Sequence, residues 1–237
     1  MILKPGKYTV LVISDQQIPF HHPDMFEFLS WLKKKYKPDY VVNIGDEVDM
    51  HAISDYDHDP DGYSPGHELT KSIEYLKELY KIFPKVKAVT SNHTARPFRR
   101  AKKFGIPRAY LKEYHEFLQA PKGWEWRDSW NIDGVHYFHG EGYSGPMGAA
   151  KAAMNLGRPV VMGHLHSDAG IHYIASDAQL IYGFNVGCLI DRKSYAFAYG
   201  KAMPKKPIIG TGLVVKGVPI FIPMLLNKNG RWIGASK

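Results

Sequence analysis

The chain has 237 residues, 44% of them hydrophobic and 13% aromatic, which excludes an intrinsically disordered protein and is enough to bury a sizeable core. Its formal net charge of +8 favours polyanionic partners, of which nucleic acid is the commonest in a cell, although a basic surface also serves solubility alone. No apolar run reaches the roughly 18 residues that a membrane-spanning helix requires.

The single cysteine and the N-terminal segment indicate the cellular compartment in which we expect the protein. One cysteine, Cys188, excludes an intramolecular disulfide and fits a reducing environment. Its neighbours are small or apolar, which indicates a packing residue rather than a nucleophile. Residues 1–6 lack the apolar core of a signal peptide. We therefore expect a cytoplasmic protein with no membrane partner, and the sequence leaves its oligomeric state open.

The N-terminal half alternates β-like apolar runs with amphipathic helical patterns. Strands are expected at residues 7–14, 40–44 and 86–90. Helices are expected over residues 23–36 and from about 69 to 83, because apolar residues recur there at helical spacing. Between them, residues 51–67 are rich in Asp, His, Gly and Pro and predict an exposed loop. Two consecutive βαβ units predict parallel strands, whose carboxyl ends are where ligand sites form.

The C-terminal half predicts shorter elements. Residues 96–112 are basic and expected to be helical, with a break near Gly105 and Pro107. Further strands are expected at residues 135–138, 160–162 and 179–186, with a small-residue helix over about 146–156. Residues 212–222 predict a hairpin that turns at Lys216-Gly217, and we expect it to complete a second sheet packed on the first. No internal repeat or linker is evident, which predicts a single domain over residues 1–237.

Five polar clusters each follow one of the β-like runs. They are Asp15-Gln16-Gln17, Gly45 to Asp49, Ser91-Asn92-His93, His139-Gly140 and Gly163 to His166. Any one cluster has an ordinary alternative, since an Asp after a strand is often a helix N-cap and a Gly-Asp pair is often a turn. Together they supply the Asp, Gln, Asn and His donors of a two-metal hydrolase site, held at strand ends on a rigid sheet.

In their order and spacing, the clusters resemble the signature of the calcineurin-like metallophosphoesterase superfamily, D-x-H, G-D-x-x-D, G-N-H-[DE], H and G-H-x-H. The resemblance runs from about residue 8 to residue 187. It implies an α/β fold with a two-sheet β-sandwich core flanked by helices, the four-layer αββα architecture. It also implies a metal-dependent phosphoester hydrolase, in which a hydroxide bridging two divalent ions attacks phosphorus in line.

Carried over residue by residue, the family's metal ligands fall into two sets that share Asp46 as a bridge. One set is Asp15, Gln17, Asp46 and His166, and the other is Asp46, Asn92, His139 and His164. Oxygen and nitrogen donors without thiolate favour Mn²⁺, with Fe or Zn²⁺ as alternatives.

Three positions depart from the family pattern. Gln17 stands where the family usually has His, and an amide oxygen is a weaker donor to a transition metal than imidazole. Some active members share this Gln, so the change does not imply an inactive enzyme. Ser91 replaces a Gly, which is a modest steric change. Thr94 replaces the acidic residue that in the family supports the histidine at position 93, which puts the tuning of His93 in doubt.

Three residues have catalytic roles implied by the resemblance or by their spacing. His93 would face the departing oxygen and stabilise or protonate it. Asp49 would orient a ligand or a nearby histidine. Arg96 follows His93 by three residues and would pair with a phosphate, the alternative being an exposed arginine that begins a helix. The other basic residues of this segment form either a solvated face or a clamp: Arg99, Arg100, Lys102, Lys103 and Arg108.

The substrate class is less constrained than the chemistry. A phosphodiesterase acting on DNA, RNA or nucleotides is favoured by the net charge, by the basic segment and by four aromatic residues that would stack bases if they are not core residues. These are Trp124, Trp126, Trp130 and Tyr143. The alternatives are a phosphomonoesterase or protein phosphatase, and a degenerate scaffold that binds nucleic acid without catalysis.

Overall fold

The computed structural model describes residues 5–55, 60–194 and 204–234. The N-terminal stretch on which the expectation about a signal peptide depends lies partly outside these ranges. Within them, no helix is both long enough and apolar enough to cross a membrane.

The first sheet has six strands in the order β11-β10-β1-β2-β3-β4. These are β1 (Thr9–Ile13), β2 (Tyr40–Asn43), β3 (Val86–Val89), β4 (Trp124–Arg127), β10 (Gly210–Val215) and β11 (Val218–Pro223). Strands β1 to β4 run parallel, as the two consecutive βαβ units predict. Strand β10 pairs antiparallel with β1, with Leu11 opposite Leu213.

The second sheet has five strands in the order β5-β6-β7-β9-β8. They are β5 (Trp130–Ile132), β6 (Val135–Tyr137), β7 (Val160–Met162), β8 (Ala169–Ala175) and β9 (Leu180–Val186). Here β6, β7 and β9 are parallel, while β5 and β8 close the two edges antiparallel.

Five α-helices and two 3₁₀ turns complete the part of the chain that the structure describes. They are α1 (Met25–Tyr36), η1 (His51–Ile53), α2 (Pro65–Ile82), α3 (Arg96–Lys103), η2 (Arg108–Tyr110), α4 (Tyr114–Phe117) and α5 (Gly148–Leu156). Helix α2 begins at Pro65, earlier than the expected start near residue 69 and inside the loop expected over residues 51–67. The Ser64 hydroxyl accepts the His67 amide and Pro65 occupies the first turn, so the helix starts at this cap.

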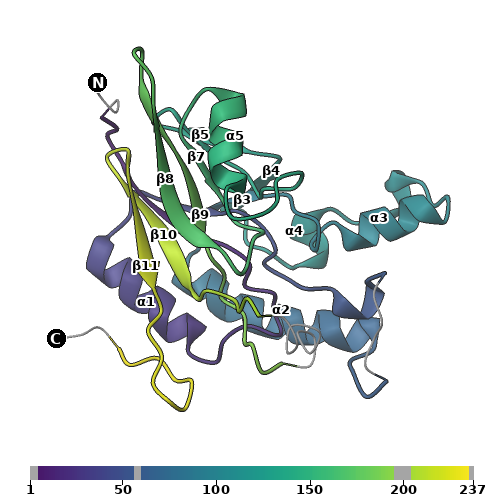
Figure 1. Ribbon diagram of the computed structural model, residues 1–237. Coiled ribbons are helices and arrows are strands. Elements are labelled where there is room, and N and C mark those ends of the chain that lie inside the picture. Colours follow the sequence, from purple (N-terminus) through teal and green to yellow (C-terminus); the bar gives the residue numbers. More distant parts are fainter. Residues whose placement is uncertain (1–4, 56–59, 195–203, 235–237) are drawn as a thin grey trace.

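The elements stack in four layers (Figure 1). Successive side chains of a strand point to opposite faces, so Leu11 and Ile13 pack against α1 and α2 while Val10 and Val12 face the second sheet. On the outer side of that sheet, α5 packs its alanines against Val160 and Ile181. The αββα sandwich expected from the sequence is therefore confirmed.

One expectation about strands was wrong, and three strands were not expected. The C-terminal hairpin does not complete the second sheet, because β10 pairs with β1 and extends the first one. Strands β4, β5 and β8 were not expected, and β5 has only three residues while β8 is half-buried. Such short or weakly patterned runs carry little of the alternation that identifies a strand.

Candidate metal centre

All five polar clusters meet at one edge of the sandwich, beyond the carboxyl ends of β1, β2, β3, β6 and β7. The first sheet supplies the clusters that contain Asp15, Asp46 and Asn92, and the second supplies His139 and the cluster at residues 163–166. Four of the seven predicted ligands have a left-handed backbone: Asp15, Gln17, Asp46 and His164. Such conformations are costly for residues other than glycine and concentrate at functional sites.

Two motif glycines allow the clusters to come this close. A Cβ on Gly163 would lie 1.9 Å from the Ser14 hydroxyl oxygen and 2.4 Å from a carboxylate oxygen of Asp15. Gly45 has a φ of +101°, and a Cβ there would lie 2.5 Å from the Cβ of Ser91. Any larger residue at either position would therefore push the strand ends apart.

Asp15 lies at the junction of the two sheets. Its Oδ1 is 2.9 Å from Nε2 of His166, and its Oδ2 accepts the backbone N–H of His164 at 2.9 Å and the hydroxyl of Ser14. Carboxylate oxygens of Asp15 and Asp46 and a ring nitrogen of His166 all lie within 4.8 Å of one another. This spacing fits convergence on a shared cation.

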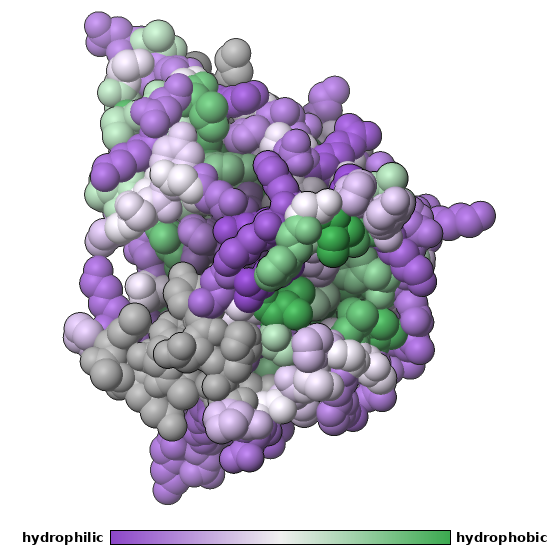
Figure 2. All heavy atoms as spheres, turned by 90° about the vertical axis from the view of Figure 1, so that its right-hand side faces the viewer, coloured by the Kyte–Doolittle hydropathy of each residue, from purple (hydrophilic) through white to green (hydrophobic). Residues whose placement is uncertain are grey.

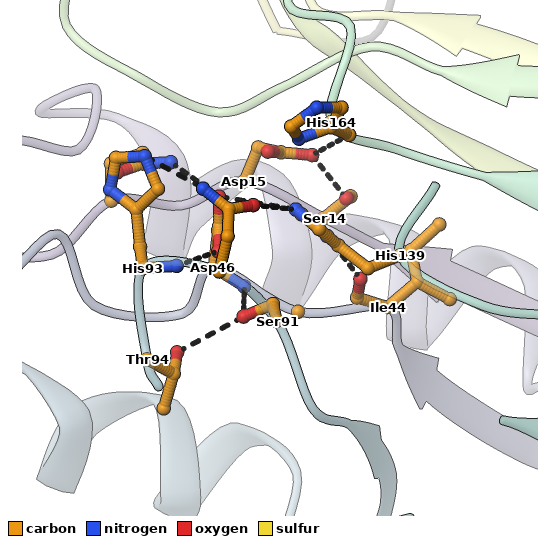
Figure 3. Close-up of polar contacts among 12 residues, drawn as sticks. Ser14, Asp15, Ile44, Asp46, Ser91, His93, Thr94, His139 and His164 are labelled. Atoms are coloured by element: carbon orange, nitrogen blue, oxygen red, sulfur yellow. Dashed lines mark hydrogen bonds and ion pairs between the residues drawn. The ribbon is translucent and has the colours of Figure 1, made fainter. Parts of the chain in front are cut away.

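Asp46 is the most connected carboxylate of the site (Figure 3). Its Oδ2 lies 3.3 Å from Nε2 of His139 and accepts the side-chain amide of Gln17 at 3.0 Å, and its Oδ1 accepts the backbone N–H of His93 at 3.0 Å. Burial alone would raise the pKa of both buried carboxyls, but facing histidines outweigh it. The pKa of Asp15 is therefore lowered, and that of Asp46 lies well below its usual value.

The ring of His139 is oriented with Nε2 facing the carboxylate of Asp46. Its Nδ1 lies 2.8 Å from the carbonyl oxygen of Ile44, which orients the ring. Its Nε2 then points toward Oδ1 of Asn92, at 2.8 Å, and toward Asp46. Burial disfavours the charged ring, yet the Asp46 carboxylate raises the pKa of His139 to about 10. A cation between these groups would take the place of that proton.

One buried oxygen of the site has no partner among the described residues. The amide of Gln17 donates from Nε2 to Asp46, which leaves its Oε1 buried and unpaired. A buried unpaired acceptor is costly unless something binds it. With this oxygen, two buried carboxylates and imidazoles directed at them, the residues present fit a site for divalent cations.

His93, Asp49 and Arg96 form a second group next to the carboxylates. Nδ1 of His93 lies 3.1 Å from the carbonyl oxygen of Asp49 and 3.3 Å from its Oδ1. Nε2 of His93 faces Oδ2 of Asp46 at 3.8 Å. Burial lowers the pKa of His93, but the carboxylates of Asp46 and Asp49 outweigh burial and raise it. These contacts with Asp49 fix the orientation of the His93 ring, and a role of Asp49 in catalysis stays a prediction.

Arg96 begins α3 but is not solvent-exposed. Its side chain is 12% exposed, and its Nη1 donates to the carbonyl oxygen of Asp49 at 2.6 Å and to Oδ1 at 2.9 Å. Its Nη2 lies 3.2 Å from Nε2 of His93. The guanidinium therefore holds the Asp49–His93 pair in place, and a contact with phosphate stays a prediction.

Two departures from the family pattern now have a local explanation. Ser91 accepts the backbone N–H of Asp46 at 2.7 Å, so its hydroxyl fixes the loop that carries this carboxylate. Thr94 is fully buried, accepts the Ser91 hydroxyl at 3.3 Å and makes no described hydrogen bond with His93. Asp49 supports His93 instead.

Glu47 is a buried carboxyl that the sequence reading did not single out. It is fully buried directly after Asp46, and Nε1 of Trp126 donates to its Oε1 at 3.0 Å. Burial raises the pKa of Glu47 to about 7. Glu47 lies within the motif Gly45 to Asp49, but nothing in the sequence indicates its burial or its partner.

The aromatic residues suggested for base stacking serve mainly the core. Trp124 and Trp130 are 3% and 6% exposed and donate to the carbonyl oxygens of Phe83 and Ala88. Trp126 is half-buried against the core cluster that contains Trp124. Cys188 is buried, and burial raises the pKa of its thiol, as expected of a packing residue.

An apolar hollow of about 390 Å³ is lined in part by residues that directly follow members of the His93 group in the sequence. Its lining includes Met50, which follows Asp49, and Pro97, which follows Arg96. Figure 2 shows apolar side chains gathered on the face that carries α3 and α4, surrounded by hydrophilic ones.

No protein-family model matches the chain, and no curated protein matches its sequence. Among solved structures, its fold is similar to that of Yfce, a phosphoesterase from E. coli, with 16% identity, a TM-score of 0.45, and 95% of this chain and 97% of that chain covered. It is also similar to Vps29 from Chaetomium thermophilum, with 13% identity, a TM-score of 0.45, and 95% and 92% of the two chains covered. In the order of its polar clusters, and in the two-sheet sandwich that brings them to one edge, the chain is similar to the calcineurin-like metallophosphoesterases.

Proposed function

We propose that this protein is a metal-dependent phosphoester hydrolase with a dinuclear centre, and that it acts on phosphodiesters of nucleic acids or nucleotides. The observation that carries the proposal is the set of donors around Asp46. Two carboxylates, a partnerless amide oxygen and imidazole nitrogens converge from two sheets, next to a histidine that is not among the expected ligands.

The two sets of ligands divide as the family signature implies. Asp15, Gln17 and His166 would hold one ion, Asn92, His139 and His164 would hold the other, and Asp46 would contact both. When bound, divalent ions such as Mn²⁺ lower the pKa of water and neutralise charge on the phosphoryl oxygens. The buried carboxylates have lowered pKa values, so they are ready to bind cations at neutral pH.

We expect His93 to protonate or stabilise the departing oxygen. Asp49 holds its Nδ1, so its Nε2 is directed toward the carboxylate of Asp46, where the phosphate would lie. A proton on Nε2 would pass to the leaving oxygen as the ester bond breaks. The same proton would displace Nη2 of Arg96, which would then be free to contact a phosphate oxygen.

The test is hydrolysis of bis(p-nitrophenyl) phosphate with Mn²⁺, against a chelator and against Asp46→Asn. We expect metal-dependent turnover that falls at least about a thousandfold in Asp46→Asn, because an amide bridges cations poorly. Asp177→Asn, at an exposed position between β8 and β9, is the matched control and should keep the wild-type rate.

The outcomes separate the candidate functions. Faster turnover of p-nitrophenyl phosphate than of the diester would favour a phosphomonoesterase. No metal-dependent turnover of either compound would leave a non-catalytic scaffold as the better description. Near-normal turnover by Asp46→Asn would contradict the assignment of the centre.

A further inference from the structure

Residues 96–112, here called the basic arm, extend directly from the candidate catalytic group. The arm starts at Arg96, which contacts Asp49 and His93, and continues through α3 and η2 away from the sandwich (Figure 1). It contains seven Lys or Arg residues and no Asp or Glu. Such a concentration of one charge next to a phosphoester site indicates a polyanionic ligand.

Ion pairs neutralise only part of this charge. Asp55 accepts from Arg100 at 2.6 Å and from Lys103 at 3.0 Å, and Glu113 accepts from Arg108 at 2.7 Å. Three further cations of the arm make no ion pair with any residue in the described ranges, and all three are exposed. They are Arg99, Lys102 and Lys112.

Two exposed aromatic rings lie between these cations in the sequence. Phe104 is 72% exposed and Tyr110 is 79% exposed, although both are large apolar side chains. Every residue from 102 to 110 is exposed, and within α3 itself Ala101 is the only buried residue. Aromatic faces next to cations are the surface on which the bases of a single strand stack while its phosphates are neutralised.

Hydrogen bonds and a cation–π contact hold the arm in one shape. The backbone N–H of Ile106 donates to the carbonyl oxygen of Ala101 at 2.9 Å, which closes the turn after α3. The guanidinium of Arg108 lies 3.9 Å from the ring centre of Phe98. Arg100 donates to the carbonyl oxygen of Ile53 at 2.7 Å and anchors α3 to η1. The exposed rings are therefore displayed on a preformed support.

The length of the arm matches a short run of nucleotides. Eight residues of α3 span about 12 Å at 1.5 Å per residue. A stacked strand advances roughly 3.4 Å per nucleotide, so α3 corresponds to about three or four nucleotides beyond the phosphate at the metal centre.

We propose that the basic arm binds single-stranded nucleic acid on one side of the scissile phosphate, with Phe104 and Tyr110 stacking on bases and Arg99, Lys102 and Lys112 contacting phosphates. The inference rests on the proposed function, since it places a polynucleotide in that site. It also assigns base stacking to Phe104 and Tyr110, and not to the tryptophans that the structure places in the core.

The first test measures binding without cleavage. A fluorescein-labelled 20-nucleotide oligothymidylate is titrated by fluorescence anisotropy with the full-length protein in EDTA, at several salt concentrations. The triple variant R99Q/K102Q/K112Q should bind at least about tenfold more weakly at low salt. Its slope of log affinity against log salt should be shallower by about 2, because each phosphate contact on a single strand contributes about 0.7.

The matched control removes the same charge elsewhere. K34Q/K77Q/K228Q changes three exposed lysines on other faces and should bind within about twofold of the wild type, since most surface charges contribute little to a specific contact. Equal weakening in both triple variants would overturn the proposal, because the effect would then come from net charge and not from the arm.

The aromatic part of the proposal has its own variants. F104A/Y110A should weaken binding about tenfold with an unchanged salt slope, because stacking is not electrostatic. M154A/Y173A removes two exposed apolar side chains from other faces and should have no effect. No difference between these two variants would overturn the stacking role, as would a change of oligomeric state in size-exclusion chromatography that accounts for the weakening.

Hydrolysis separates failure of the inference from failure of the proposed function. With Mn²⁺, the ratio of kcat/KM for the oligonucleotide to kcat/KM for bis(p-nitrophenyl) phosphate should fall about tenfold or more in R99Q/K102Q/K112Q and stay unchanged in K34Q/K77Q/K228Q. If the small diester is turned over and this ratio is unchanged in R99Q/K102Q/K112Q, the proposed role of the basic arm is wrong and the proposed function still holds. Arm-dependent binding without any turnover would overturn the proposed function and keep the arm as a binding surface.

Discussion

The side-chain amide of Gln17 donates from Nε2 to Oδ2 of Asp46 at 3.0 Å, and its own carbonyl oxygen is left buried without a partner in the described ranges. The residue that departs most from the family signature is therefore oriented by the residue expected to bridge the metals. A donor already directed into the site needs little rearrangement to coordinate an ion.

Gln17→His should tighten one metal site, since imidazole is a stronger donor to Mn²⁺ or Zn²⁺ than an amide oxygen. We expect a gain on the order of tenfold in affinity, the scale on which single changes around a bound metal act. Isothermal titration calorimetry of Mn²⁺ into chelator-treated protein measures it directly. Gln17→Leu removes the donor and should weaken the same site, and identical isotherms for all three proteins would place residue 17 outside the coordination sphere.

Asp49→Asn should lower kcat by about tenfold to a hundredfold at pH 7, with a smaller change in KM. The carboxylate of Asp49 both orients His93 and raises the pKa of His93, and the variant loses both effects. A general acid works in its protonated form, so activity is lost as pH rises through the pKa of His93. Removing the Asp49 charge lowers that pKa and should move the alkaline limb of the kcat profile to lower pH. An alkaline limb at the same pH in Asp49→Asn and wild type would exclude this role.

Glu47→Gln should stabilise the metal-free protein, and more so at higher pH. Burial raises the pKa of Glu47 to about 7, whereas an exposed Glu ionises near 4.3. Between about pH 4 and pH 7, Glu47 therefore carries a proton in the folded state that it lacks in the unfolded state. Its contribution to the free energy of unfolding falls as pH rises through this range. By pH 8 the loss amounts to about 4 kcal/mol.

Urea unfolding at pH 5 and pH 8, in the presence of a chelator, measures the effect of Glu47→Gln. The amide keeps an acceptor for Nε1 of Trp126, so this hydrogen bond is retained. Glu125→Gln, at an exposed position of β4, is the control and should not respond to pH in this way. The prediction fails if the Glu47→Gln difference from wild type is the same at both pH values.

His21→Phe should reduce the loss of stability in mild acid. His21 is 9% exposed between the rings of Phe26 and Tyr75, and burial, with the adjacent His22, lowers its pKa to about 4. The unfolded chain binds a proton at this histidine below about pH 6.5 and the folded chain does not, so stability falls as pH drops from 6.5 to 4. The total is about 3 kcal/mol.

The measurement is the free energy of unfolding of His21→Phe across this pH range, with His115→Phe as an exposed control. The wild type and the control should lose stability in parallel, while His21→Phe follows a flatter curve. Parallel curves for all three proteins would show that His21 is protonated in the folded state as readily as in the unfolded one.

The parts of the fold that were predictable are those with a strong local pattern. The helix α1 and the parallel strands β1 to β3 follow from helical spacing and buried apolar runs, and they place Asp15 and Asp46 at the same edge. The pairing of β10 with β1 was not predictable, because alternation identifies a strand and its two faces but not its neighbour. Long-range pairing is decided by the whole sheet.

The candidate site also has a part that the sequence predicted and a part that it did not. The expected metal ligands were chosen from the ordered motifs, and the structure brings all seven of these residues together. The sequence did not predict the partner of Arg96. Asp49 is distant in sequence, and a guanidinium beside a phosphate site can pair with either a phosphate or a carboxylate. Glu47 and the exposed rings of Phe104 and Tyr110 were missed because the sequence does not reveal burial or exposure within a loop or a short helix.

The candidate metal centre draws its donors from both sheets, with Asp15 and Asp46 on one and His139 and His166 on the other. Cations bound there would act as a cross-link between the two halves of the sandwich. Binding to the folded state alone adds RT ln(1 + [M]/Kd) to its stability, so metal supply would govern how long the protein survives as well as how fast it turns over. A cell short of the metal would then lose the folded protein along with its activity.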